Sequence, residues 1–296
     1  NTDLTIDLYR ADGTLLGTSS TFNPATSAFE YTDATGYSGT IIARLVDASS
    51  GADYRDEATG ASLDAPDNLL AIANVDGSGN VSISLTPLTH MAATQAGVTA
   101  TSSAVSFTQP LTEATTNAAN TNVGKALGVD DILVAPVFTL DANGVSQTPD
   151  AYGIALSLIS AQEEILGQTT EQVMATLSSQ LTGDTLSNEA KASLILSAEE
   201  IPEVAKSTAR TQLDISPLEV FDAYSSATTV LPALTLEDYT AASVTGVTAT
   251  NLAAVNASVL AAAAGGADTT TKVQALITAA NAAVAKIEAY NNGDGT

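Results

Sequence analysis

The residues of this chain that could carry out chemistry are nearly all carboxylates. The sequence has 296 residues, of which 33 are Asp or Glu and one is His, and it contains no Cys. The lack of Cys excludes disulfides, thiolate zinc sites and cysteine nucleophiles, and a single His excludes a multi-histidine metal centre. Carboxylates can bind a hard cation such as calcium, or act as a pair of acids in hydrolysis. The sequence therefore leaves calcium binding, carboxylate catalysis or a purely structural role.

Oxygen ligands suited to calcium are densest between residues 130 and 144. Asp130 and Asp131 are adjacent, and Asp141 and Asn143 follow within an Asp-Ala-Asn-Gly sequence. Calcium prefers the oxygens of Asp, Asn and backbone carbonyl groups. The segment lacks the closing Glu of a twelve-residue EF-hand loop, and Asp-x-Asn-Gly is also an ordinary turn sequence. We predict a calcium site at Asp130, Asp131, Asp141 and Asn143, with plain turns as the alternative.

Adjacent carboxylates offer the second kind of chemistry, glycoside hydrolysis by two acids across a cleft. The pairs Glu163-Glu164 and Glu199-Glu200 lie in segments predicted to be helical, where neighbouring side chains diverge by about 100°. Such pairs are more typical of a solvated helix face. The chain also has no Trp and only 4% aromatic residues, so it offers few platforms for stacking sugars. A carboxylate-dependent hydrolase is the weaker alternative, and we assign no catalytic residue.

The single imidazole and the few cations favour structural roles. His90 would have to serve any Ser-His-Asp triad, but the chain has no Gly-x-Ser-x-Gly motif. It lies instead in the first turns of a predicted helix, beside Met91. Arg44 lies on a predicted strand, where we expect it to pair with a carboxylate rather than bind an anionic ligand.

The charge of the chain excludes two classes of partner. The formal net charge is -24, with only nine Lys and Arg, so the surface repels phosphate backbones and nucleic-acid binding is not expected. No apolar stretch approaches the roughly 18 residues needed to span a bilayer, so no membrane insertion is expected. The 45% hydrophobic content argues against a disordered acidic tail.

The elements that must position these side chains begin with β-structure in residues 1–86. Leu4, Ile6 and Leu8 alternate with polar residues, which is the period of a half-buried strand. Several more short runs follow, separated by turn sequences such as 76–80. Six or seven strands at this spacing predict an antiparallel β-sandwich, Ig-like or transthyretin-like, in a chain of the α+β class.

Helices are predicted from Thr86-Pro87 to the end of the chain. A Thr followed by Pro is a helix cap and a favoured first helical residue, and Ser216-Pro217-Leu218-Glu219 is a capping box. Residues 97–122 read as loop or weak helix. The net charges of residues 1–86, 87–230 and 231–296 are -9, -12 and -3. We therefore predict three parts: the sandwich at 1–86, a helical domain at 87–230 and a small Ala-rich helical repeat at 231–296.

The predicted β-sandwich is followed by the segments LTPLTHMAA (85–93), GVDDILVAPVFTLDANG (128–144) and TPDAYGIALSLIS (148–160). This order of segments resembles a module of RTX-type, biofilm-forming surface adhesins of marine and aquatic Gammaproteobacteria. The tail at 235–260 and 273–295 looks like a helical repeat of similar giant surface proteins. The nine-residue glycine-aspartate repeat of the RTX β-roll is absent, so the resemblance implies a scaffold or ligand-binding-region module.

The resemblance implies an extracellular location on the bacterial cell surface. The implied partners are neighbouring domains of the same adhesin, and a peptide or glycan on a host or biofilm surface. It also implies an ion at residues 291–294, at the junction to a following domain. We therefore expect a non-enzymatic module that scaffolds or spaces ligand-binding domains in cell attachment and biofilm formation. Direct peptide or glycan binding, through a concave surface at the sandwich–helix junction, is the alternative.

Overall fold

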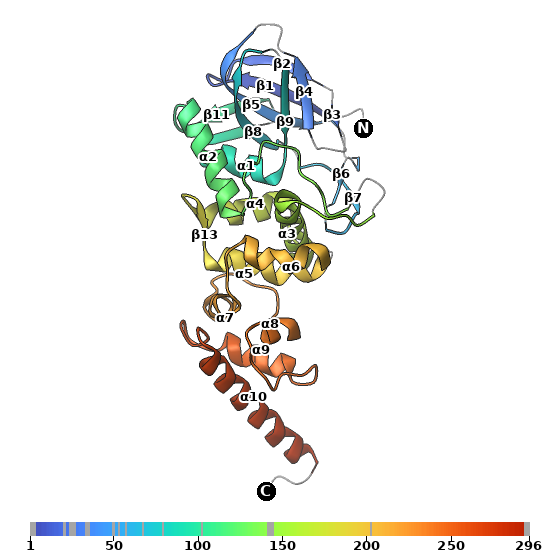
Figure 1. Cartoon of the computed structure of the whole chain (residues 1–296), viewed down its shortest axis with the longest axis vertical. Helices are drawn as coiled ribbons and strands as arrows, with labels where there is room; N and C mark the ends of the chain where they lie inside the picture. Colours follow the sequence, from blue (N-terminus) through green and yellow to red (C-terminus); the bar gives the residue numbers. More distant parts are fainter. Residues whose placement is uncertain are drawn as a thin grey trace. The chain divides into compact units, whose positions relative to one another are not determined.

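The chain is mixed α/β, with antiparallel strands near its N-terminus followed by helices, as the sequence predicts (Figure 1). The computed structural model describes residues 4–292 except 20, 21, 24–27, 33–35, 49, 50, 53, 57, 67, 79, 102, 141–144 and 202. None of the helices in this part of the chain has the length and apolar character needed to cross a membrane.

The larger sheet has four antiparallel strands in the order β2-β1-β5-β8. In β1 the alternation predicted from the sequence is confirmed, because Leu4, Ile6 and Leu8 are buried and at most 2% exposed. All six residues 40–45 of β5 are buried, so this central strand is covered on both faces. The strands span β1 (Leu4–Arg10), β2 (Leu15–Ser19), β5 (Ser38–Asp47) and β8 (Leu70–Asp76).

A second antiparallel sheet has three strands in the order β3-β4-β9. Phe29 of β4 lies opposite Ile83 of β9, and both side chains are buried. The described residues also form three two-stranded ribbons. The strands are β3 (Phe22–Asn23), β4 (Ala28–Thr32), β9 (Asn80–Ser84), β6 (Tyr54–Arg55), β7 (Ser62–Leu63), β10 (Val98–Thr101), β11 (Ala104–Phe107), β12 (Leu181–Thr182) and β13 (Thr185–Leu186).

The segment 97–122, expected as loop or weak helix, forms the β10–β11 hairpin and the start of a helix. Val98 is fully buried and pairs with Phe107, so packing of one face stabilises strands whose Thr and Ser side chains face outward. The helix that follows, α2 (Glu113–Ala126), starts at a capping box made by Thr112 and Thr115. Both features use β-branched Thr, once in a strand and once as a cap.

The helix starts predicted at Thr86-Pro87 and at Ser216 are confirmed. Thr86 caps α1 (Pro87–Gln95), and Ser216 with Glu219 forms the capping box of α7 (Pro217–Ser226). The remaining helices are α3 (Ala151–Leu166), α4 (Thr170–Ser179), α5 (Asn188–Ser197), η1 (Ala198–Glu200), α6 (Glu203–Gln212), α8 (Leu236–Ala241), α9 (Leu252–Leu260) and α10 (Thr270–Asn291).

The chain divides into two compact units. Unit 1 consists of residues 1–187 and 197–213, and unit 2 of residues 188–196 and 214–296. In unit 1, α1 and α2 pack against β8, and α3 packs against α4 and α6, so strands and helices share one body. In unit 2, α10 packs on α9, and Phe221 contacts Tyr239 edge-on with ring centroids 4.9 Å apart. The three-part division at 1–86, 87–230 and 231–296 has other limits and stays a prediction.

Gly153 lets the backbone after α2 pass close to α3. A Cβ atom at this position would overlap the carbonyl oxygen of Val137. The carboxylate of Asp150 caps the same helix end by accepting a hydrogen bond from Gly153 N at 2.8 Å. These two residues set the position of α3, which carries the polar side chains of the site described next.

Candidate functional site

The predicted calcium ligands are only partly within the described residues. Asp130 and Asp131 are exposed, and one carboxylate oxygen of Asp131 accepts a hydrogen bond from Leu133 N at 2.8 Å, as in an ordinary Asx turn. Asp141 and Asn143 lie outside the described residues. Within the part of the chain that is described, no three His, Cys, Asp or Glu residues gather as a metal site would require. The calcium site stays a prediction.

The adjacent glutamates diverge as helix geometry predicts. On α3, Glu164 is exposed, whereas Glu163 is half-buried and faces a cavity. Glu199 and Glu200 belong to the short helix η1. The structure therefore singles out one glutamate of the first pair and does not bring the two together.

His90 is half-buried and Arg44 is buried, each packed within the fold. Burial lowers the pKa of His90 below its usual value, against the opposing effect of the negative charge of Glu171. Arg44 is 3% exposed and forms an ion pair with Asp7 at 2.6 Å. Burial alone would raise the pKa of Asp7, but hydrogen bonds from Thr18 and Arg44 lower it. The pairing expected for Arg44 is confirmed.

A cavity in unit 1 lies between the strands and the start of the helical region, with a volume of about 70 Å³. Most of the residues that line it are apolar, and they belong to segments that are far apart in the sequence. A water molecule needs roughly 10–15 Å³ by the same measure, so the cavity has room for about five. The buried apolar side chains that line it are those of Leu4, Phe29, Leu45, Leu69, Leu85, Leu156 and Ile159.

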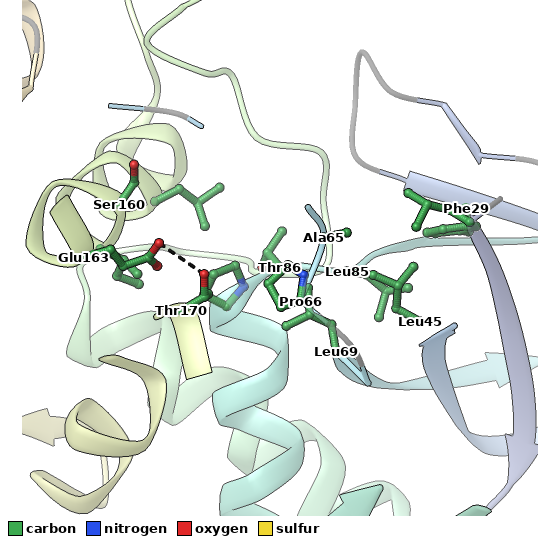
Figure 2. Close-up of a pocket in the computed structure, with 14 residues that line it drawn as sticks. Phe29, Leu45, Ala65, Pro66, Leu69, Leu85, Thr86, Ser160, Glu163 and Thr170 are labelled. Atoms are coloured by element: carbon green, nitrogen blue, oxygen red, sulfur yellow. Dashed lines mark hydrogen bonds between the residues drawn. The ribbon is translucent and has the colours of Figure 1, made fainter. Parts of the chain in front are cut away.

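The cavity has a polar end and an apolar end (Figure 2). Figure 2 shows Ser160, Glu163 and Thr170 on the helix side, and Phe29 and Leu45 on the strand side. Among the described residues that line the cavity, none is Lys, Arg or His. The carboxyl group of Glu163 therefore has no cationic side chain beside it in the lining.

Within the described residues, the carboxyl group of Glu163 accepts one hydrogen bond, from the Thr170 hydroxyl to Oε2 at 3.1 Å. The pKa of Glu163 is raised to about 7, chiefly by burial and also by the negative charges of Asp56 and Glu171, while the hydrogen bond from Thr170 lowers it. A carboxyl group in such surroundings changes its charge near neutral pH. It can therefore donate or accept a proton, or bind a cation, under ordinary conditions.

A second carboxylate, Asp56, fixes the loop between β6 and β7 on α3. It is 4% exposed, accepts a hydrogen bond from the Ser160 hydroxyl, and accepts two more from the backbone and hydroxyl of Thr59, both at 2.6 Å. Ala58 N also donates to Ser160 Oγ at 3.1 Å. Because these bonds occupy the Asp56 carboxylate, it is not available as the partner acid that two-acid hydrolysis requires.

Sequence reasoning named Glu163, and its binding alternative expected a concave surface at the sandwich–helix junction, but it did not connect the two. The available signal was the spacing of Leu156, Ile159, Ser160 and Glu163, at i, i+3, i+4 and i+7 on one face of α3. Two polar residues on an otherwise apolar helix face indicate a buried polar site. The strand residues that close the cavity are more than 70 residues away in the sequence, and no local pattern connects them to α3.

No family model, curated protein or solved structure matches this chain.

Proposed function

We propose that this chain is a non-enzymatic extracellular module of a large bacterial surface adhesin, which scaffolds or spaces ligand-binding domains in cell attachment and biofilm formation. The resemblance of its segments to RTX-type adhesins supports this proposal. The acidic surface supports it as well, because a strongly negative protein stays soluble and its self-repulsion is screened in salt. Its partners are then the neighbouring domains, with a peptide or glycan ligand as the alternative.

One observation carries the mechanical part of the proposal. Buried and half-buried polar side chains of unit 1 join segments that are far apart in the sequence. Arg44 of β5 bonds to Asp7 of β1 and to the Thr101 carbonyl of β10, and Asn120 of α2 donates to the Ile72 carbonyl of β8 at 2.9 Å. Gln212 of α6 donates to the carbonyl groups of Leu127 and Ala151 at 2.9 and 2.7 Å. Such links resist separation of strands from helices, which a spacer under tension requires.

The finer architecture in this proposal is a β-sandwich. Leu4 and Leu45 of the larger sheet and Phe29 of the smaller sheet line one cavity, so apolar side chains of both sheets face a common interior. Two antiparallel sheets that share an apolar core are the basis of a sandwich. This supports the sandwich, and the Ig-like or transthyretin-like strand order stays a prediction.

A binding module is the second candidate, favoured by the cavity itself. The cavity is lined by strands of both sheets, by α3 and by Thr170 at the start of α4, where the binding alternative expects a concave surface. Apolar cavities with a few polar groups are the usual form of small-ligand sites. The two-acid hydrolase receives no comparable support, because Asp56 is held in structural bonds.

Stretching the chain between two attachment points at its ends tests the spacer function. We expect unit 1 to resist until it opens in one cooperative step, which releases about 3.5 Å of length per residue. The variant Asn120→Ala removes one link between α2 and β8, and should lower the opening force. Thr121→Ala, at an exposed position of the same helix, serves as the control. Gradual extension at low force in the native chain would overturn the mechanical proposal.

A further inference from the structure

We propose that the cavity of unit 1 binds a small organic cation, a primary amine on a short apolar chain, with its ammonium group at Glu163 and Thr170 and its chain toward Phe29 and Leu45. This inference goes beyond the spacer function and does not depend on it. It assigns a class of ligand to the cavity between strands and helices, and no sequence motif predicts that ligand.

The charge of the site selects a cation. Glu163 has no cationic side chain beside it in the lining, and Asp56 and Glu171 add to the negative potential around it. An ionised carboxylate in apolar surroundings is unfavourable unless an opposite charge accompanies it. An ammonium group at Oε1, which accepts no hydrogen bond from the described residues, would supply that charge. A carboxylate or phosphate ligand would instead meet repulsion from three acids.

The shape and lining of the cavity select a short apolar chain. The room for about five waters corresponds to a ligand of four to six non-hydrogen atoms, such as n-butylamine. Seven buried apolar side chains line the interior, and each methylene group placed among them should tighten binding about fourfold, as far as the chain still fits.

A sugar would fit the same cavity poorly. The Ser160 hydroxyl already donates to Asp56, and the hydroxyl oxygens of Thr86 and Tyr152 are 2.6 Å apart in a bond of their own. Few hydrogen-bonding groups are left to satisfy the several hydroxyls of a saccharide, and unpaired buried hydroxyls weaken binding.

Binding should depend on pH through Glu163. The groups that face it are Thr170 and Glu171 of α4 and Asp56 of the β6–β7 loop, while Glu164 on its own helix points to solvent. A simple alkylamine keeps its positive charge below about pH 10. Glu163 is mostly protonated at pH 6 and mostly ionised at pH 8, so the affinity for the amine should rise about tenfold between them.

The test is a titration of the full chain with n-butylamine at pH 8, followed by the NMR shifts of Leu and Ile methyl groups. We expect saturable shifts at cavity residues such as Leu156 and Ile159, at least tenfold weaker binding at pH 6, and weaker binding of the neutral n-butanol and of butyrate. Glu163→Gln should weaken amine binding at least tenfold at pH 8. The matched control Glu164→Gln should leave it unchanged.

A second variant keeps the test decisive if Glu163→Gln disturbs the fold. Ala65→Leu adds a larger side chain to the cavity lining, where Ala65 is half-exposed, and should abolish amine binding. Ala61→Leu on the nearby exposed turn is its control. Absence of saturable shifts in the native chain, or equal affinity in the native, Glu163→Gln and Ala65→Leu chains, would overturn the inference. Neither outcome affects the stretching experiment, so failure of the ligand site and failure of the spacer function are distinguishable.

Discussion

At the scale of single residues, burial conflicts with the negative charge of Glu163. The side chain is half-buried at the polar end of the cavity, and its pKa is raised to about 7 from the usual 4.5. The folded protein therefore binds this proton more tightly than the unfolded chain. Between about pH 4.5 and 7 the unfolded chain releases the proton first, so folding stability falls as the pH rises through this window.

Glu163→Gln should remove this loss of stability. Gln has the same shape as protonated Glu but does not ionise. We expect the variant to match the native chain at pH 4 and to exceed it by about 2 kcal/mol at pH 8, measured by urea unfolding at both pH values. Glu164→Gln, exposed on the same helix, should change the free energy of unfolding by less than about 0.5 kcal/mol. An unchanged difference between pH 4 and pH 8 in Glu163→Gln would contradict the burial of this carboxyl group.

At the scale of elements, the features that the sequence predicts well are those set by neighbouring residues. The start of α1 follows from Thr86 and Pro87 alone, because a cap and a proline at the first helical position act within one turn. The alternation in β1 is likewise visible locally. The β10–β11 hairpin is not, because its short Thr-rich strands depend on burial of Val98, which only the folded chain provides.

The candidate site, too, can be predicted from the sequence only where it depends on neighbouring residues. The face of α3 that carries Ser160 and Glu163 can be read from helical spacing. The cavity needs Phe29 and Leu45 from two different sheets and Pro66 from a loop, and their meeting depends on sheet pairing. The predicted calcium ligands Asp130 and Asp131 are close to each other only because they are consecutive in the sequence. Their closeness does not show that a third or fourth ligand joins them.

Arg44 offers a test of how elements are joined. It is 3% exposed and links β5 to β1 through Asp7 and to β10 through the Thr101 carbonyl. Arg44→Met keeps the volume but leaves the Asp7 carboxylate without its cation, so we expect unit 1 to lose about 3 kcal/mol in urea unfolding. Lys125→Met is the control, because Lys125 pairs with Asp184 at 3.7 Å and is 63% exposed. Equal small losses in both variants would show that Arg44 does not join these strands energetically.

At the scale of the whole chain, the acidity is concentrated in residues 1–230, with -21 of the total charge of -24. Several of these carboxylates serve the fold. Asp150 and Glu219 help to cap helices, and Asp56 fixes a loop. Most of the remaining negative charge is uncompensated, so cations in solution should stabilise the chain both by general screening and, at a specific site, by binding.

The predicted calcium site separates these two effects. At calcium concentrations about a hundredfold above the dissociation constant, binding to the folded state adds about 2.7 kcal/mol, which raises the melting temperature by about 5–10 °C. We expect this rise relative to chelator at matched ionic strength, and its loss in the double variant Asp130→Asn, Asp131→Asn. The double variant Asp12→Asn, Asp76→Asn removes the same charge from two exposed residues whose carboxylates each accept a hydrogen bond from a backbone N–H two residues on, and it should keep the rise. If both double variants respond alike, the effect is screening by a divalent cation. An identical melting temperature of the native chain in calcium and in chelator would rule out the site, and the acidity would then serve the surface and the fold alone.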